Sequence, residues 1–568
     1  MRRLVAILGV ATLVAVSCSS GPTGTPGGSP TAAAATEKPV PGGNIVVGAI
    51  SDPKTMQPVI ATDTASSAVW QQFYLGLTRT NRETGETEGQ LAVDAPKVSS
   101  DGLTVTYTLR DNLVWSDGTP FSADDYKYTV EAVMRSKKTV RKSAVNTIVG
   151  AKDYEAGKAD SISGIKADGK TIAITLEKVF CPAIAGLGGA GAGGILPSAK
   201  FKTVWDNKTT DVTKNIDDNP MNDKPTVSMG PFIFKDFTPG VQVTMTKNPK
   251  YFRGEPLADQ YIIKTYADQT AIKNALITGE VTYNTVNASD FDDLTKNAAL
   301  SPYRFKSLSY NYIGWNAKSA KAPWLANKSV RQALWYGIDV DTIIKKIVFG
   351  YGTKALAHNP PVSWAYDAAG LTDYKLDTAK AKQLLESAGA KMGADGIYRW
   401  TDGSPMKMRI ETNQGNNARE TILQVAQEQY KAIGIQIDPL LESFNQLLDR
   451  TDPGTDYEGF IIGWSLGADP DPYSIWHSSQ QGKGQFNNVG FSSPAADKAL
   501  EDNRNGPDCS KAARKIANHT LDVTLNQEAP YTFLYSGDTI GFAQKTLQNF
   551  KPFTFSREWN IETWWFKK

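Results

Sequence analysis

The segment from Tyr457 to His477 joins a short apolar run to a loop that is rich in proline and acid. The apolar run, Phe460 to Trp464, is ended by glycine and proline, which is typical of a buried strand. The loop carries acidic and aromatic residues, Asp469, Asp471, Tyr473 and Trp476. A rigid loop at the end of a buried strand often carries binding groups, and acids beside flat rings suit a ligand with a cationic end and an apolar or sugar-like body. We therefore expect a binding site here, and a solvated turn with core aromatics is the alternative.

The same segment contains Gly463-Trp464-Ser465-Leu466-Gly467, which fits the Gly-x-Ser-x-Gly pattern of serine hydrolases. That pattern requires a helix directly after the serine. Pro470 and Pro472 follow within seven residues of Ser465 and prevent a helix of useful length. Only three histidines could serve as a base, His358, His477 and His519. A secreted hydrolase using Ser465 is therefore a distant alternative, and we expect no catalytic residues and no enzyme activity.

Helix and strand patterns alternate in the second half of the chain. The helical patterns are Thr270–Leu276, Ser329–Tyr336, Thr378–Ala388 and Arg419–Ile433, and the strand patterns between them include Lys407–Thr412 and Gly434–Leu440. Alternation of this kind predicts an α/β fold. Nearer the N-terminus, Asp101-Gly102 and Asp168-Gly169 each precede residues that alternate in polarity, which predicts two β-hairpins.

The charges of the chain are almost balanced. It has 568 residues, with 61 Lys and Arg against 59 Asp and Glu, and Arg2 and Arg3 account for the excess. A balanced chain lacks the broad basic surface that holds a nucleic-acid backbone, so we expect no nucleic-acid partner. With three histidines and no close cluster of histidine and cysteine, we expect no directly ligated transition metal and no cofactor.

The N-terminus has the features of an export signal. A basic pair precedes the apolar stretch Leu4 to Val16, which is too short to remain as a membrane-spanning helix. The stretch ends at Ala15-Val16-Ser17-Cys18, which resembles a bacterial lipobox, although Ala15 stands where leucine is more common. We expect residues 1–17 to be a lipoprotein signal peptide and Cys18 to be lipidated. The alternative is an ordinary secretory signal with an incidental cysteine.

Residues 18–43 have the composition of a flexible tether. They are rich in Gly, Pro, Ser, Thr and Ala, and Glu37 and Lys38 are their only charged residues. Such a segment cannot bury enough apolar surface to fold, and as a flexible chain it would reach about 25–30 Å. A tether between a lipid anchor and a globular body is the layout of an extracytoplasmic lipoprotein.

Two cysteines remain, Cys181 and Cys509. Export would place them in an oxidising compartment, where an even pair favours a disulfide. Two buried free thiols are the alternative.

Six blocks of sequence, in order, resemble the solute-binding proteins of ABC importers in the oligopeptide/dipeptide family (bacterial family 5). The blocks are Leu75–Arg79, Trp115–Tyr126, Met229–Phe232 with Asn248–Tyr251, Tyr310–Asn316 with Val330–Asp339, Gly463-Trp464 with Asp471-Pro472, and Ala529–Tyr535. The resemblance runs from about Gly42 to Lys568.

This resemblance implies a two-lobed α/β periplasmic-binding-protein fold. One lobe would comprise residues 44–263 and 495–568, with an extra subdomain at about 60–180, and the other would comprise residues 264–494. Hinge closure would trap a peptide in the cleft between the lobes for delivery to a membrane permease. The protein would be a monomer, anchored to the outer face of the cell membrane or periplasmic.

The family also implies which residues meet the ligand. An aspartate after the Gly-Trp strand contacts the α-amino group of the peptide, and its nearest match is Asp469, with Asp471 as the alternative. Weaker candidates for lining the cleft are Trp464, Tyr473, Trp476, Trp315, Asn316 and Asn413, and core packing is the alternative for each aromatic. The family also binds oligosaccharides and other small solutes, so the ligand class stays open.

Overall fold

The computed structural model describes residues 38–201 and 216–568. The predicted signal peptide, Cys18 and most of the predicted tether lie outside these residues. Residues Val40–Lys568 form one compact unit. No helix within the described residues is both long enough and apolar enough to cross a membrane.

The first sheet of this unit joins strands from distant parts of the sequence. Its order is β1-β10-β9-β8, with β1 at Asn44–Ala49, β10 at Gln260–Thr265, β9 at Gln242–Lys247 and β8 at Phe232–Thr238. β1 pairs with β10 in parallel, and the other pairs are antiparallel. Ile45 and Val47 of β1 are buried in a large core, because alternate residues of a strand point to the same face.

The two predicted hairpins form a second sheet of order β4-β5-β7-β6. Its strands are β4 at Lys97–Val98, β5 at Thr104–Thr108, β7 at Thr171–Thr175 and β6 at Ile165–Asp168. Gly102 and Gly169 lie in their turns at φ +72° and +54°, a region that glycine adopts without steric cost. Helix α2, Ala123–Arg135, contacts this sheet, and the Ser122 N–H at its start donates to the Asp125 carboxylate at 3.0 Å.

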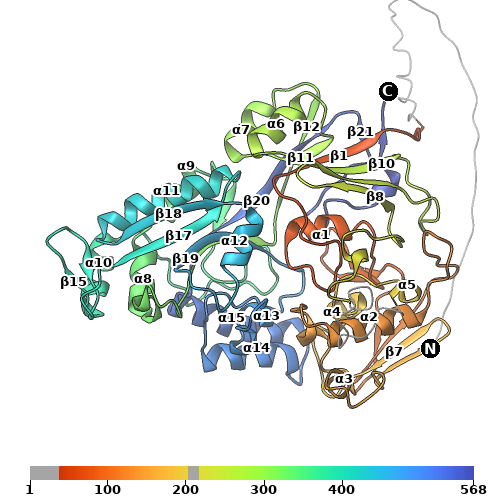
Figure 1. The fold of residues 1–568 in the computed structure, drawn as a ribbon, viewed down its shortest axis with the longest axis horizontal. Coiled ribbons are helices and arrows are strands. Elements are labelled where there is room, and N and C mark those ends of the chain that lie inside the picture. The colour runs from red at the N-terminus through yellow and green to blue at the C-terminus, as the bar shows by residue number, and fades with distance from the viewer. Residues whose placement is uncertain (1–37, 202–215) are drawn as a thin grey trace, which may run out of the picture. The chain divides into compact units, whose positions relative to one another are not determined.

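The largest sheet has eight strands, and its main path runs β11-β20-β13-β19-β17-β18. The bounds are β11 Tyr283–Thr285, β20 Tyr531–Gln544, β13 Ser309–Trp315, β19 Gly459–Ser465, β17 Lys407–Asn413 and β18 Gln436–Glu442, and β12 Leu300–Lys306 and β14 Gly352–Lys354 also pair with β20. Helix α11, Asn417–Ala432, connects the parallel strands β17 and β18 and packs against them (Figure 1). The predicted helix–strand alternation is confirmed here.

Strand β20 contributes side chains to four separate hydrophobic cores. Its first part pairs with β13 and β14, and its second part pairs with β11 and β12. Helices α14, Pro494–Asn505, and α15, Lys511–Glu528, share a core with Tyr310 and Tyr312 of β13. The lobe boundaries stay a prediction, and this packing favours placing α14, α15 and the start of β20 with the second lobe.

The remaining helices and strands are shorter or lie at the margins of these sheets. They are α1 Thr64–Trp70, β2 Thr78–Thr80, β3 Thr87–Gly89, α3 Ala151–Glu155, α4 Ala183–Gly186, α5 Ser198–Phe201, α6 Gln269–Ile277, α7 Ala288–Leu294, α8 Lys328–Tyr336, α9 Val340–Lys346, α10 Thr378–Ser387, β15 Lys391–Met392, β16 Tyr398–Arg399, α12 Phe444–Arg450, α13 Tyr473–Trp476, β21 Leu547–Gln548 and β22 Trp565–Phe566.

A disulfide joins Cys181 to Cys509, with their Cα atoms 5.1 Å apart. It connects the segment before α4 to the loop between α14 and α15. The Cys181 N–H also donates to the Arg504 carbonyl oxygen at 2.7 Å. The bond therefore ties two segments that are 328 residues apart in sequence.

Replacing both cysteines by serine should lower the thermal midpoint of unfolding. Closing so long a loop in the unfolded chain corresponds to about 2–5 kcal/mol of stability. Calorimetry with and without reductant measures the effect. Reductant should lower the midpoint of the wild type and leave that of the double variant unchanged. Equal midpoints for oxidised wild type and double variant would contradict the prediction.

Candidate functional site

Strand β19 lies in the middle of the large sheet, between β13 and β17. Phe460 and Ile461 are buried, which confirms the predicted buried strand. The strand ends at Ser465, and the next helix, α13, begins at Tyr473. The helix that a hydrolase elbow needs directly after Ser465 is therefore missing from this segment.

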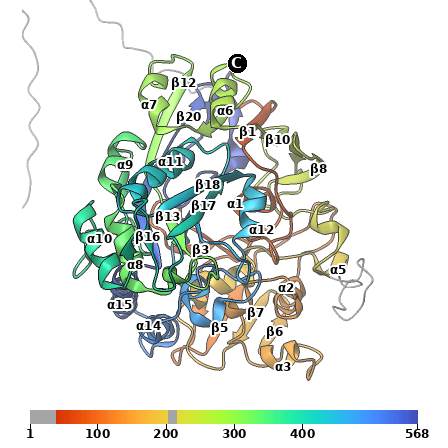
Figure 2. The ribbon, with the colours of Figure 1, turned by 60° about the vertical axis from the view of Figure 1, so that its left-hand side comes forward.

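A cavity of about 800 Å³ opens beside β19. One side is formed by β19, by α12 and by residues 483–488, and the other by residues 54–71 and Lys138. Figures 1 and 2 both show α12 facing α1. The cavity has the size of a typical ligand pocket, and its walls come from both of the predicted lobes.

Aromatic and aliphatic side chains supply much of the β19 side of this cavity. Trp464 is only partly buried, its Nε1–H donates to the Tyr531 hydroxyl at 3.3 Å, and its ring meets Phe486 edge-on with centroids 5.4 Å apart. Ile462 and Tyr312 lie opposite each other on paired strands and line the same cavity. This wall can contact a ligand through flat rings and apolar surface.

Charges of both signs border the cavity. Lys54 Nζ lies 2.6 Å from Asp449 Oδ1 of α12, so the two sides meet at this point. Asp452 accepts a hydrogen bond from the Gly484 N–H at 2.6 Å, and burial raises the pKa of its carboxyl. The cavity can therefore pair with either end of a zwitterion, although exposed ion pairs contribute little energy.

A smaller cavity of about 300 Å³ adjoins the first and shares Trp464, Ser465, Leu466, Gly467 and Phe486 with it. His358 lines it and is buried, which lowers the pKa of the imidazole to about 3. Its Nδ1 accepts a hydrogen bond from Trp476 Nε1 at 3.1 Å. The imidazole is therefore neutral at physiological pH, and its hydrogen bond fixes the indole ring of Trp476 in the core.

Both loop aspartates are paired with arginines. Asp469 contacts Arg514 through two bonds of 2.6 and 2.7 Å, and Asp471 contacts Arg504 through bonds of 2.7–2.9 Å. Burial raises the pKa of Asp469, and Arg514 acts in the opposite direction. The two carboxylates border the smaller cavity, but their charges are already compensated inside the protein. Their contact with a ligand ammonium stays a prediction.

Three of the predicted aromatic residues lie away from the large cavity. Trp476 and Trp315 are fully buried, and Trp315 donates to the Thr532 hydroxyl at 3.1 Å. The Tyr473 ring stacks on His477 with centroids 4.1 Å apart, and the Arg504 guanidinium covers it. Trp315 and Trp476 thus pack in the core and Tyr473 is only partly buried, whereas Trp464 lines the cavity. Contact of these three residues with a ligand stays a prediction.

The two predicted asparagines also have structural partners. Asn316 donates to the Tyr457 carbonyl oxygen at 2.8 Å and borders a separate cavity of about 290 Å³. Asn413 is buried and accepts a hydrogen bond from Arg419 at 2.8 Å. Neither residue lines the 800 Å³ cavity, and a role for either one in ligand binding stays a prediction.

Several lining residues were missed by the sequence analysis. The most informative are Phe444 and Leu448 of α12, which are both only partly buried and lie four residues apart. Residues at this spacing share one face of a helix. An apolar pair on a short helix directly before the Gly-Trp strand was the signal that could have identified this wall.

Asp522 is a buried carboxylate behind the smaller cavity. It accepts hydrogen bonds from the backbone N–H and side-chain amide of Asn359 at 3.2 and 3.0 Å, and Asn359 lines that cavity. Burial nevertheless raises the pKa of Asp522 to about 7. A proton on this carboxyl therefore stabilises the folded protein.

Replacing Arg514 by methionine should destabilise the protein by about 3 kcal/mol, because Asp469 would remain as an uncompensated buried charge. The double change Arg514→Met and Asp469→Leu removes both charges and should recover most of the loss. Chemical denaturation of the two variants measures this difference. Equal destabilisation by the single and double changes would show that the pairing is not the cause.

The stability of the wild type should fall as pH rises from about 4 to 7, because the folded state holds the Asp522 proton over a range in which the unfolded chain has released it. Asp522→Asn removes the contribution of this carboxyl to the dependence. Relative to the wild type, the variant should therefore be more stable at pH 8 than at pH 5, by about 2 kcal/mol. Thermal unfolding at both pH values measures the effect, and a pH-independent difference would argue against it.

Comparison with known proteins identifies the fold and the family. The sequence model for bacterial extracellular solute-binding proteins, family 5 (middle), matches residues 86–487. The oligopeptide-binding protein AppA of Bacillus subtilis is 29% identical over 548 residues, which are 94% of this chain and 93% of AppA. The structure of AppA in complex with a nonapeptide superposes with a TM-score of 0.84 and covers 94% of this chain and 100% of that one.

A more distant structure shares the fold alone. NikZ of Campylobacter jejuni, in complex with Ni(L-His), superposes with a TM-score of 0.78 at 24% identity, covering 92% of this chain and 99% of its own. The two-lobed α/β periplasmic-binding-protein fold is therefore confirmed. This chain belongs to the bacterial extracellular solute-binding proteins of family 5, the oligopeptide- and dipeptide-binding family.

Proposed function

We propose that this protein is the lipid-anchored, extracytoplasmic binding subunit of an ABC importer and that it captures peptides in the 800 Å³ cavity. The observation that carries the proposal is the composition of that cavity. Its walls come from residues far apart in sequence, and they combine aromatic surface with charges of both signs. A peptide presents apolar side chains and two opposite terminal charges. The structure of AppA in complex with a nonapeptide supports this class of ligand.

Closure of the cavity by a hinge motion is part of the proposal. The ion pair of Lys54 and Asp449 joins the two sides of the cavity, and the two side chains are 28% and 77% exposed. Such a pair can separate at little energetic cost when the cavity opens. Release of the peptide to a membrane permease would follow the opening. Export and the lipidation of Cys18 are inferred from the sequence pattern alone. A monomeric state is inferred from the family resemblance.

The ligand can be identified by mass spectrometry of small molecules that copurify with the protein and are released by mild denaturation. We expect a mixture of short peptides with varied sequences, because main-chain contacts accept many side chains. A single defined sugar or other solute would instead support the alternative ligand class and would overturn the peptide assignment.

Trp464→Ala should weaken the binding of a copurified peptide about thirtyfold, since loss of a central aromatic contact costs about 2 kcal/mol. Trp400→Ala is the matched control, because Trp400 is also partly buried and lies outside the cavity. Titration calorimetry measures both variants. Equal affinities for the two would remove Trp464 from the peptide-binding site.

A further inference from the structure

A second cavity of about 450 Å³ lies on the opposite face of the large sheet. Asn311 of β13 lines it, whereas Tyr312, the next residue, lines the 800 Å³ cavity. Successive residues of a strand point to opposite faces, so the sheet separates the two cavities. Their sets of lining residues do not overlap. This second cavity is therefore distinct from the proposed peptide site.

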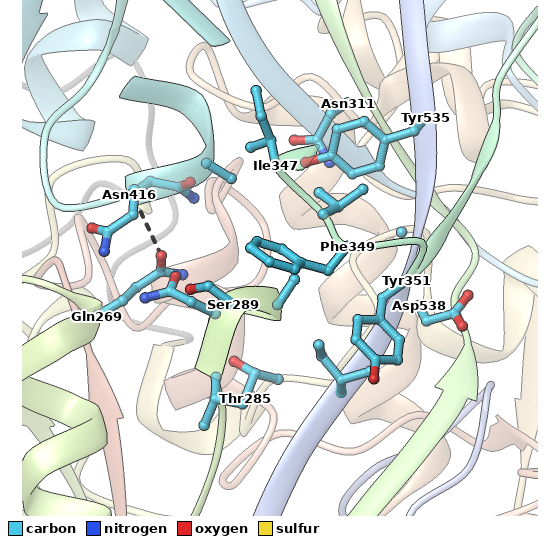
Figure 3. A pocket seen from close by; sticks show the side chains of 18 of the residues that line it. Gln269, Thr285, Ser289, Asn311, Ile347, Phe349, Tyr351, Asn416, Tyr535 and Asp538 are labelled. Atoms are coloured by element: carbon cyan, nitrogen blue, oxygen red, sulfur yellow. Dashed lines mark hydrogen bonds between the residues drawn. The ribbon is translucent and has the colours of Figure 1, made fainter. Parts of the chain in front are cut away.

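The second cavity lies where two hydrophobic cores meet. Val286 and Ile540 belong to the core around α7, and Val348 and Tyr535 belong to the core around α11. All four residues line the cavity. The start of α11 closes another side, where the Asn417 N–H donates to the Gln269 side chain at 3.3 Å (Figure 3). The wall is thus assembled from several separate segments of the chain.

Arg419, in the first turn of α11, brings a positive charge to this cavity. It donates to the side-chain oxygen of Asn413 at 2.8 Å and to that of Asn311 at 3.4 Å, and both partners are neutral. Within residues 38–201 and 216–568, no carboxylate forms an ion pair with it. A guanidinium that loses contact with water is normally paired with an anion, and Arg419 is partly buried and borders the cavity, where an anion could reach it. The positive end of the α11 dipole acts in the same direction.

Asp538 also borders the cavity, but its carboxylate does not compensate the charge of Arg419. Asp538 accepts bonds of 2.7 Å from both Arg304 and Lys306. Lys346 also lines the cavity and is exposed. The net charge around the cavity is therefore positive, which favours an anionic ligand over a cationic one.

Phe349 gives the cavity an aromatic surface. Its side chain is 51% exposed, and Figure 3 shows the ring reaching into the cavity toward Ser289. Its backbone lies at φ +50°, a left-handed conformation that is strained for a bulky residue, at the end of α9 where glycine is usual. Strain of this kind is concentrated at ligand sites. An exposed ring and an uncompensated guanidinium in the walls of one cavity suit an anion that carries a flat apolar group.

We propose that this cavity binds a small organic anion, in which a carboxylate contacts Arg419 and a flat apolar group packs on Phe349. The site is independent of the peptide cavity. A carboxylate accepts two parallel bonds from a guanidinium, which a neutral amide of the same shape cannot reproduce. The proposal therefore requires discrimination between benzoate and benzamide.

The test is a titration of the full-length protein with benzoate, monitored by ligand-observed NMR. The same titration with benzamide, the neutral analogue, gives the affinity for comparison. Benzoate should bind at least tenfold more tightly than benzamide. Arg419→Gln should weaken benzoate about tenfold, and Phe349→Ala about fivefold. Phe553→Ala is the matched control, because Phe553 is 41% exposed and lies outside this cavity, and it should leave the affinity unchanged.

Phe349→Ala keeps the test decisive if Arg419→Gln lowers stability, because the Phe349 ring is exposed and its loss leaves no buried void. Trp464→Ala should leave benzoate binding unchanged, which separates this site from the peptide cavity. Absence of benzoate binding, equal binding of benzamide, or equal affinities of the Phe349→Ala and Phe553→Ala variants would each overturn the proposal. Loss of benzoate binding in Trp464→Ala would also overturn it.

Discussion

The pairing of β19 with β13 determines which side chains reach each face of the large sheet. Trp464 lies opposite Tyr310, and Gly463 lies opposite Asn311. A Cβ atom on Gly463 would come within 3.0 Å of the Asn311 side-chain oxygen and 3.2 Å of the Arg419 guanidinium. Glycine at this position therefore lets Arg419 approach the sheet from the α11 side, while Trp464 points into the cavity on the other side. A shift of one residue in this register would exchange the two faces.

Local patterns were enough to predict the elements that build this sheet. The apolar run at 460–464, the helical period at 419–433 and the two Asp-Gly turns each depend on neighbours within one element, and each appears as predicted. The contacts of the loop aspartates could not be predicted in this way. Arg514 and Arg504 lie 45 and 33 residues beyond Asp469 and Asp471, on helices whose packing against the loop is set by the whole core.

The aromatic residues illustrate the same limit. Trp464 and Trp476 lie in one segment of 21 residues, Tyr457 to His477, yet one lines a cavity and the other is fully buried. The difference comes from Tyr531, Phe533 and His358, which belong to other segments and enclose Trp476. Sequence spacing gives the face of an element on which a ring lies, but not the tertiary neighbours that cover it.

The internal pairing of the loop aspartates also affects how the large cavity can recognise a ligand. A compensated carboxylate offers a ligand ammonium little net charge, so rings, apolar side chains and backbone groups must supply much of the binding, beside the charged residues that border the cavity. Such contacts depend weakly on the identity of ligand side chains, whereas a buried polar group that fits one partner rejects others strongly. The mixed wall around Trp464, Ile462 and Phe486 therefore favours a binding protein that accepts many peptides over one that selects a single sequence.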